Sequence, residues 1–171
     1  MTQKSAQSPM DPELPTRVAE SFVGWMAGRG VSLGFDRVSL ERDFELALER
    51  RFFRSNKPIL QVGERRYDLE TGAACFFGEA LRQRYSGQWF GELGPNSGVN
   101  YYLVQIRFGE YVFNPFSWIG YRLTNGRKSA GTVKDCLRAV TPSMKDGIDH
   151  KRIRIDSIIA SGGVVVDSEV Y

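Results

Sequence analysis

The segment DLETGAACFFGEALRQRYSGQWF, residues 68–90, determines the expected fold because it joins a long helix to the start of a strand. Asp68 can cap a helix that runs to about Tyr85, and Gly87 can end that helix. A strand is predicted to begin at Trp89. The apolar residues recur at helical spacing, so one face of the helix should point into the core. The positions expected to face inward are Leu69, Ala73, Phe76, Phe77, Ala80 and Leu81.

The same helix contains three small residues, Gly72, Ala74 and Gly78, at helical spacing. A glycine inside a helix costs roughly 1 kcal/mol relative to alanine. We therefore expect another element, most simply a strand, to approach this helix closely enough to compensate for that cost.

Two more helices are predicted ahead of this segment, over residues 16–30 and from Ser39 to about Arg54. Thr16 can cap the first helix and Gly30 can end it. The second has acids in its first turn and arginines in its last, the charge order that suits a helix dipole. We therefore favour a solvated helix end over an anion site for these arginines. The expected inward positions are Val18, Phe22, Val23 and Met26 in the first helix, and Leu40, Phe44, Ala47, Leu48 and Phe52 in the second.

The chain after Gly87 changes to strand composition. Residues 99–108 alternate in a way that predicts a strand, and Gly109 with Glu110 fits a two-residue hairpin turn. The chain should then return as a second strand over 111–113. One face of the first strand is expected to hold Tyr102, Val104, Ile106 and Phe108.

Short helices and strands are predicted in the C-terminal third. One helix is expected over 116–123, and another should begin at Thr132, where Asp135 completes a capping box, and end before Pro142. The segments with strand composition are 153–159 and 163–166.

These elements predict an α+β fold in which N-terminal helices pack on one antiparallel β-sheet, followed by short C-terminal helices and strands. Residues 1–14 are expected to be a flexible leader, and residues 15–171 a single domain. Residues 55–64 are expected to be a connector.

Composition excludes several classes of function. The net charge of +3 comes from 23 basic and 20 acidic residues, so a nucleic-acid site would need a local basic face. The sequence contains neither a secretory signal nor an apolar run long enough to span a membrane, which predicts a cytoplasmic protein. Two cysteines and one histidine argue against a zinc site, and no nucleotide-binding or hydrolase motif occurs. We therefore expect no metal, no cofactor and no catalytic residue.

Glu79 is the carboxylate of greatest interest, because it lies beside the apolar stripe of the central helix. It can pair with Arg82 or Gln83, three and four residues on, or it can act as a general base in a small carboxylate-dependent enzyme. Cys75 lies among alanines and phenylalanines, where desolvation should leave its thiol unreactive. The paired-carboxylate interpretation is preferred.

Aromatic side chains and arginines alternate through the second half of the chain, among them Tyr101, Arg107, Trp118 and Arg122. Such a set can pack the core, stack single-stranded nucleic acid, or form a protein-binding patch. Together with Glu79, these four residues are the candidate binding residues.

Two segments, GAACFFGEALRQRYSGQW at 72–89 and NPFSWIGYRLTNG at 114–126, resemble a widespread family of uncharacterised small bacterial proteins. Members of that family combine a helix containing a Gly-Glu pair, a Gly-x-Trp step and an NPF turn, and some occur near toxin-immunity or secretion genes. The resemblance implies an association with such genes and assigns no catalytic residue.

The expected function is a non-enzymatic cytoplasmic protein-binding module, of the immunity or adaptor type, that binds a partner protein. The alternatives are a small carboxylate-dependent enzyme and, less favoured, a binder of single-stranded nucleic acid. Neither membrane attachment nor tight nucleic-acid binding is expected.

Overall fold

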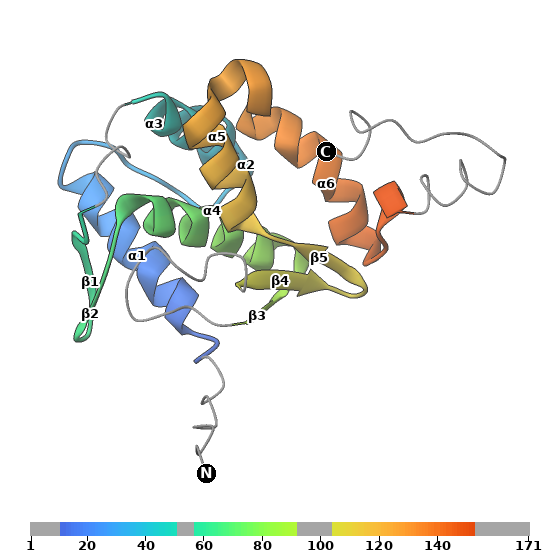
Figure 1. The fold of residues 1–171 in the computed structure, drawn as a ribbon, viewed down its shortest axis with the longest axis horizontal. Helices are drawn as coiled ribbons and strands as arrows, with labels where there is room; N and C mark the ends of the chain where they lie inside the picture. The colour runs from blue at the N-terminus through green and yellow to red at the C-terminus, as the bar shows by residue number, and fades with distance from the viewer. Residues whose placement is uncertain (1–10, 51–56, 92–103, 153–171) are drawn as a thin grey trace, which may run out of the picture.

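The structure, a computed structural model, describes residues 11–50, 57–91 and 104–152, and the predicted α+β class is confirmed (Figure 1). The helices are α1 (Leu14–Ala27), α2 (Arg37–Ser39), the π-helical turn η1 (Leu40–Phe44), α3 (Glu45–Glu49), α4 (Leu69–Tyr85), α5 (Pro115–Ala130) and α6 (Val133–Asp146). The strands are β1 (Leu60–Val62), β2 (Arg65–Tyr67), β3 (Gln88–Phe90), β4 (Gln105–Phe108) and β5 (Tyr111–Phe113).

Helix α4 runs through the middle of the molecule, and every residue from Thr71 to Leu81 is buried. The sequence predicted one buried face, whereas the helix is enclosed on all sides. The Asp68 side chain caps it by accepting a hydrogen bond from the Thr71 amide at 2.7 Å, as predicted.

The end of α4 differs from the prediction. Ser86, not Gly87, adopts the left-handed conformation there, with a φ of 55°. Gly87 is needed for packing instead, because a Cβ at this position would lie 2.4 Å from Cε1 of Phe108. The absence of a side chain at Gly87 thus lets β4 pack against the end of the helix.

The small residues of α4 are explained by close neighbours, as expected. A Cβ on Gly72 would meet side chains of Phe22 and Leu60, and a Cβ on Gly78 would lie 2.3 Å from Cη2 of Trp89. Strands β1 and β3 therefore both send a side chain against α4, which agrees with the predicted approach of a strand.

The N-terminal helices begin earlier than predicted. Leu14 is both helical and buried, so α1 starts within the segment expected to be a leader, and Thr16 lies inside the helix rather than at its cap. The second helix starts after Asp36, whose side chain caps it, and ends at Glu49. Its predicted C-terminal positions beyond Arg50 lie outside the described residues.

Within the described residues, two small antiparallel sheets replace the single sheet that was expected. The first, β1 with β2, is a hairpin within and just after the segment predicted to be a connector. It was missed because its strands are three residues long and bury only Leu60 and Tyr67. The second sheet has the order β3-β4-β5 and turns at Gly109, as predicted.

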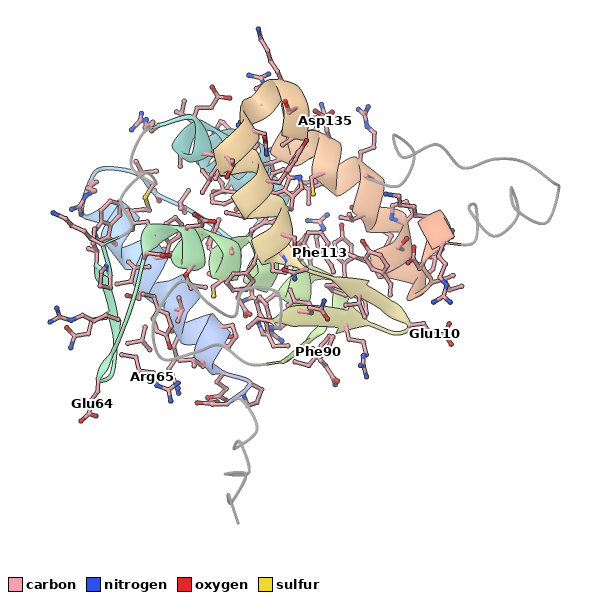
Figure 2. The ribbon with its side chains drawn as sticks, viewed as in Figure 1. Glu64, Arg65, Phe90, Glu110, Phe113 and Asp135 are labelled. Carbon is pink, nitrogen blue, oxygen red and sulfur yellow. The ribbon has the colours of Figure 1, made fainter. Side chains whose placement is uncertain are left out.

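The inner face of the three-stranded sheet points toward α4. Trp89, Ile106 and Phe113 form one buried cross-strand row, and Phe77 of α4 meets the Phe113 ring edge-on at 6.0 Å. Gln88, Arg107 and Val112 form the neighbouring row on the outer face. Figure 2 labels Phe113 on β5 and Phe90 on β3, the two outer strands of this sheet.

The C-terminal helices are longer than predicted. Asn114 caps α5, which is interrupted at Gly126, where φ is 75°, and then continues to Ala130. The capping box of Thr132 and Asp135 is confirmed, but α6 continues through Pro142 and ends at Gly147. The strands predicted after residue 152 lie outside the described residues. Within the three described ranges, no helix has both the length and the apolar character that crossing a membrane requires.

Opposite effects are expected from alanine at two helical glycines. Gly24→Ala in α1 should raise the free energy of unfolding by about 0.5 to 1 kcal/mol, because its Cβ would meet nothing within 4 Å. Gly78→Ala should lower it by about 1 to 3 kcal/mol, because its Cβ would overlap the Trp89 ring. Urea denaturation of both variants measures the difference, and a Gly78→Ala protein as stable as Gly24→Ala would contradict the packing described.

Candidate functional site

Glu79 is a fully buried carboxylate that binds side chains from three elements. Arg82 donates through Nε and Nη2 at 2.8 and 2.7 Å, and Gln83 donates at 2.9 Å, so both predicted helical partners are confirmed. Thr16 of α1 donates its hydroxyl at 3.0 Å, and the indole Nε1 of Trp89 in β3 donates at 2.9 Å. These residues are called the Glu79 network.

The Glu79 network favours a structural carboxylate over a general base. Burial alone would raise the pKa of Glu79, but hydrogen bonds from Arg82, Trp89 and Gln83 outweigh burial and lower it. Five donor groups occupy its two oxygens, so no convenient lone pair remains to take a proton from a substrate.

Arg122 is likewise directed into the protein. Its Nη2 lies 2.7 Å from Oε1 of Glu45 and 3.0 Å from Oε1 of Glu49, and its side chain is 4% exposed. The other oxygen of Glu45 accepts from the amide of Val133 at 2.6 Å. Arg122 therefore connects α5 to α3, and through Glu45 to the start of α6.

The other predicted binding residues do not meet at one place. Trp118 is partly buried, with its ring 5.0 Å from that of Phe77. Arg107 is exposed on the outer face of the sheet, with its guanidinium 4.7 Å from the Phe90 ring. Tyr101 lies outside the described residues. Of the described candidates, Glu79 and Arg122 are thus buried, Trp118 is partly buried, and Arg107 is exposed on a strand.

A different surface stands out beside the second helix. A groove of about 470 Å³ lies between residues 30–34 and the run from α2 to α3. Val38 and Leu46 line it and are 63% and 53% exposed, the highest values among the large apolar side chains of the described residues. The lining of this α2–α3 groove is Gly30, Val31, Ser32, Leu33, Gly34, Asp36, Val38, Ser39, Arg42, Asp43, Leu46, Ala47 and Arg50.

The π-helical turn η1 explains why Val38 and Leu46 share the groove. In a regular α-helix, residues eight positions apart lie about 80° out of phase. A π-turn accommodates one extra residue, and here the amide of Glu45 reaches back to the carbonyl of Leu40, five positions away. The eight-residue spacing between Val38 and Leu46 is then equivalent to seven residues of a regular α-helix. Their side chains therefore lie within about 20° of each other around the helix axis.

Several charged groups at the groove are already bound to the protein. Arg42 forms a two-point ion pair with Asp43, at 2.8 and 3.1 Å. Asp36 accepts the amide of Ser39 at the start of the helix. The exposed apolar pair therefore distinguishes this surface more than its charge does.

Sequence reasoning missed this groove, although a signal was present. Leu40, Phe44, Ala47 and Leu48 are buried as predicted. Val38 and Leu46 lie off that stripe, and a large apolar residue on the polar face of a helix indicates a second contact surface.

Neither cysteine lies in a reactive environment. Cys75 and Cys136 are free thiols, and both are buried. Burial raises the pKa of Cys75 well above its ordinary value and that of Cys136 to about 12. Over the described part of the chain, no three of the His, Cys, Asp and Glu side chains gather closely enough to hold a metal ion.

No protein-family model matches this chain, and comparisons with curated proteins and with solved structures find no significant match. The family resemblance of residues 72–89 and 114–126 therefore stays a prediction. Function has to be inferred from the geometry of the chain itself.

Glu79→Gln should destabilise the protein by about 2 kcal/mol at neutral pH, because charge-assisted hydrogen bonds are replaced by weaker ones. Since folding lowers the pKa of Glu79, the contribution of its charge is present above about pH 4.5 and is lost as the pH falls through the folded-state value. Denaturation curves between pH 7 and 3 should show the gap between wild type and variant closing in acid. The exposed Glu110→Gln should show no such gap, and a gap independent of pH would contradict the assignment.

Both thiols should resist modification in the native state, because only the thiolate reacts and burial suppresses it. Titration with a thiol reagent should detect almost no reaction without denaturant and two thiols after unfolding. Rapid labelling of Cys75 in the folded protein would contradict this prediction and make Cys75 a candidate catalytic nucleophile.

Proposed function

We propose that this protein is a non-enzymatic, cytoplasmic binding module that docks a partner protein in the α2–α3 groove. The observation that carries the proposal is the exposure of Val38 and Leu46 on one side of a concave surface. Exposed apolar side chains that line a hollow are typical of docking sites. Two free, buried thiols are also in keeping with a reducing compartment.

The expected partner segment is an amphipathic helix. Val38 and Leu46 lie about two helical turns apart on one side, which suits a helix that presents apolar anchors at positions i and i+7. Because Arg42 is already paired with Asp43, the complex should depend mainly on apolar burial. Its affinity should then change little with salt.

An immunity or adaptor role, in which the module occludes its partner, rests on the resemblance of residues 72–89 and 114–126 to the bacterial family described above. The carboxylate-enzyme alternative loses its main candidate, since Glu79 is occupied by five donors. A nucleic-acid site would instead be centred on Arg107 and Phe90, on the outer face of the three-stranded sheet. It would produce a steep fall of affinity with salt.

The double variant Val38→Asp with Leu46→Asp should abolish partner binding, because it places two charges where the partner's apolar side chains would pack. Wild-type protein would be used to capture partners from the native host, and each captured protein would be purified and titrated by calorimetry. We expect the double variant to bind a genuine partner at least about a hundredfold more weakly than wild type does, a loss of about 2.7 kcal/mol of binding free energy.

Ile148→Asp is the matched control, since Ile148 is 41% exposed and lies outside the groove. It should bind the partner as wild type does, and affinity should change less than about threefold between 0.05 and 0.5 M salt. Equal binding by the double variant, or capture of nucleic acid that elutes with salt, would contradict the proposal. Sedimentation that shows a wild-type dimer, dissociated by the double variant, would assign the groove to self-association instead.

A further inference from the structure

A second hollow lies between the first turn of α4 and the outer side of α5. It has a volume of about 370 Å³, within the range of sites for small ligands. Among the described residues, only α4 and α5 contribute to it, and none of its lining belongs to the α2–α3 groove. The lining of this α4–α5 cleft is Glu70, Phe116, Ser117, Gly120, Tyr121, Thr124 and Asn125.

Glu70 supplies the charge of the cleft and is half-buried. Among the described residues, no side chain forms an ion pair or hydrogen bond with its carboxylate. Burial raises the pKa of Glu70, and the nearby Asp68 raises it further. Its place in the first turn of α4 favours a negative charge but provides no counter-ion.

Gly120 keeps the carboxylate open to the cleft. A Cβ at this position would lie 3.2 Å from Oε1 of Glu70, closer than an ordinary contact. A larger side chain on α5 would therefore cover the oxygen that a ligand has to reach.

The rest of the lining suits a positively charged alkyl group. Tyr121 is 50% exposed and contributes its aromatic side chain to the lining, and Phe116 provides apolar surface. Ser117 and Thr124 bring hydroxyl groups, and the side-chain amide of Asn125 donates to the carbonyl of Tyr121, which leaves its oxygen as an acceptor. Acceptors with an aromatic face are the surroundings that ammonium groups favour.

Other classes of ligand fit less well. An anion would meet the Glu70 charge, and none of the described residues in the lining is cationic. A divalent metal needs several carboxylate or imidazole ligands, and no such group of three occurs in the described ranges. A primary ammonium group needs one counter-ion and acceptors for three N–H groups, and the lining can supply both.

We propose that the α4–α5 cleft binds a primary alkylammonium group, with Glu70 as its counter-ion and Tyr121 against its alkyl chain. This chemistry occurs in free alkyl diamines and in lysine side chains of proteins. The cleft shares no described lining residue with the α2–α3 groove. A substitution that abolishes amine binding in the cleft should therefore leave partner docking in the groove unchanged, and the reverse should also hold.

The test is an NMR titration of the ¹⁵N-labelled full chain with three compounds. These are 1,4-diaminobutane, Nα-acetyl-lysine methylamide and the neutral 1,4-butanediol. Both amines should cause saturable shifts at the amides of Gly120 and Tyr121, and the diol should not. Tighter binding of the diamine indicates a free amine as the natural ligand, whereas tighter binding of the lysine compound indicates a side chain of another protein.

Glu70→Gln keeps the size of the side chain and removes its charge, so amine affinity should fall at least about tenfold. Glu64→Gln, an exposed acid at the tip of the β1–β2 hairpin, is the matched control and should bind as wild type does. Gly120→Ala retains the carboxylate but crowds it, and should also weaken binding while the circular dichroism spectrum stays unchanged. Unsaturable shifts, equal binding of the diol, or an unaffected Glu70→Gln with native circular dichroism would each overturn the proposal.

Discussion

The enclosure of α4 on all sides is the constraint on which the rest of the structure depends. A helix buried over eleven consecutive residues, Thr71 to Leu81, needs neighbours around its whole circumference. Helix α1, helix α5 and the side chains of β1 and β3 supply them, and Gly72 and Gly78 let these neighbours come close. The short strands are thus stabilised chiefly by packing on α4, since isolated small sheets are marginal in water.

Burying α4 also buries the charge of Glu79, and the fold meets that charge with donors from other elements. Thr16 and Trp89 bring α1 and β3 to the same carboxylate, while Arg122 and Glu45 join α5, α3 and α6 in a second, largely buried pair. A buried ion pair contributes little net stability, but removing one partner is costly. The two networks therefore fix the relative positions of the helices more than they add to stability.

Local signals in the sequence predicted much of this fold. The Asp68 cap, the Thr132 capping box and the turn at Gly109 each depend on residues close together in the chain, and all three are confirmed. Long-range contacts were not predictable: Gly87 is required by Phe108 of β4, and Arg122 is drawn inward by Glu45. The candidate sites were predictable only in part: Val38 and Leu46 lie off the buried stripe, but neither the π-turn beside Leu46 nor the gap that Gly120 leaves over Glu70 has a signature in composition or spacing.

The π-turn at Leu40–Phe44 makes chain length at this point a determinant of surface chemistry. Deleting one residue would let the run close into regular α-helix, with Val38 and Leu46 seven positions apart and still within about 20° of each other. Inserting one more residue there would instead turn Leu46 and everything after it by about 100° relative to Val38, which would separate the two apolar side chains. Among descendants of this sequence, an insertion within residues 40–44 would therefore mark a change of binding partner, whereas a one-residue deletion there would preserve the apolar pair of the groove.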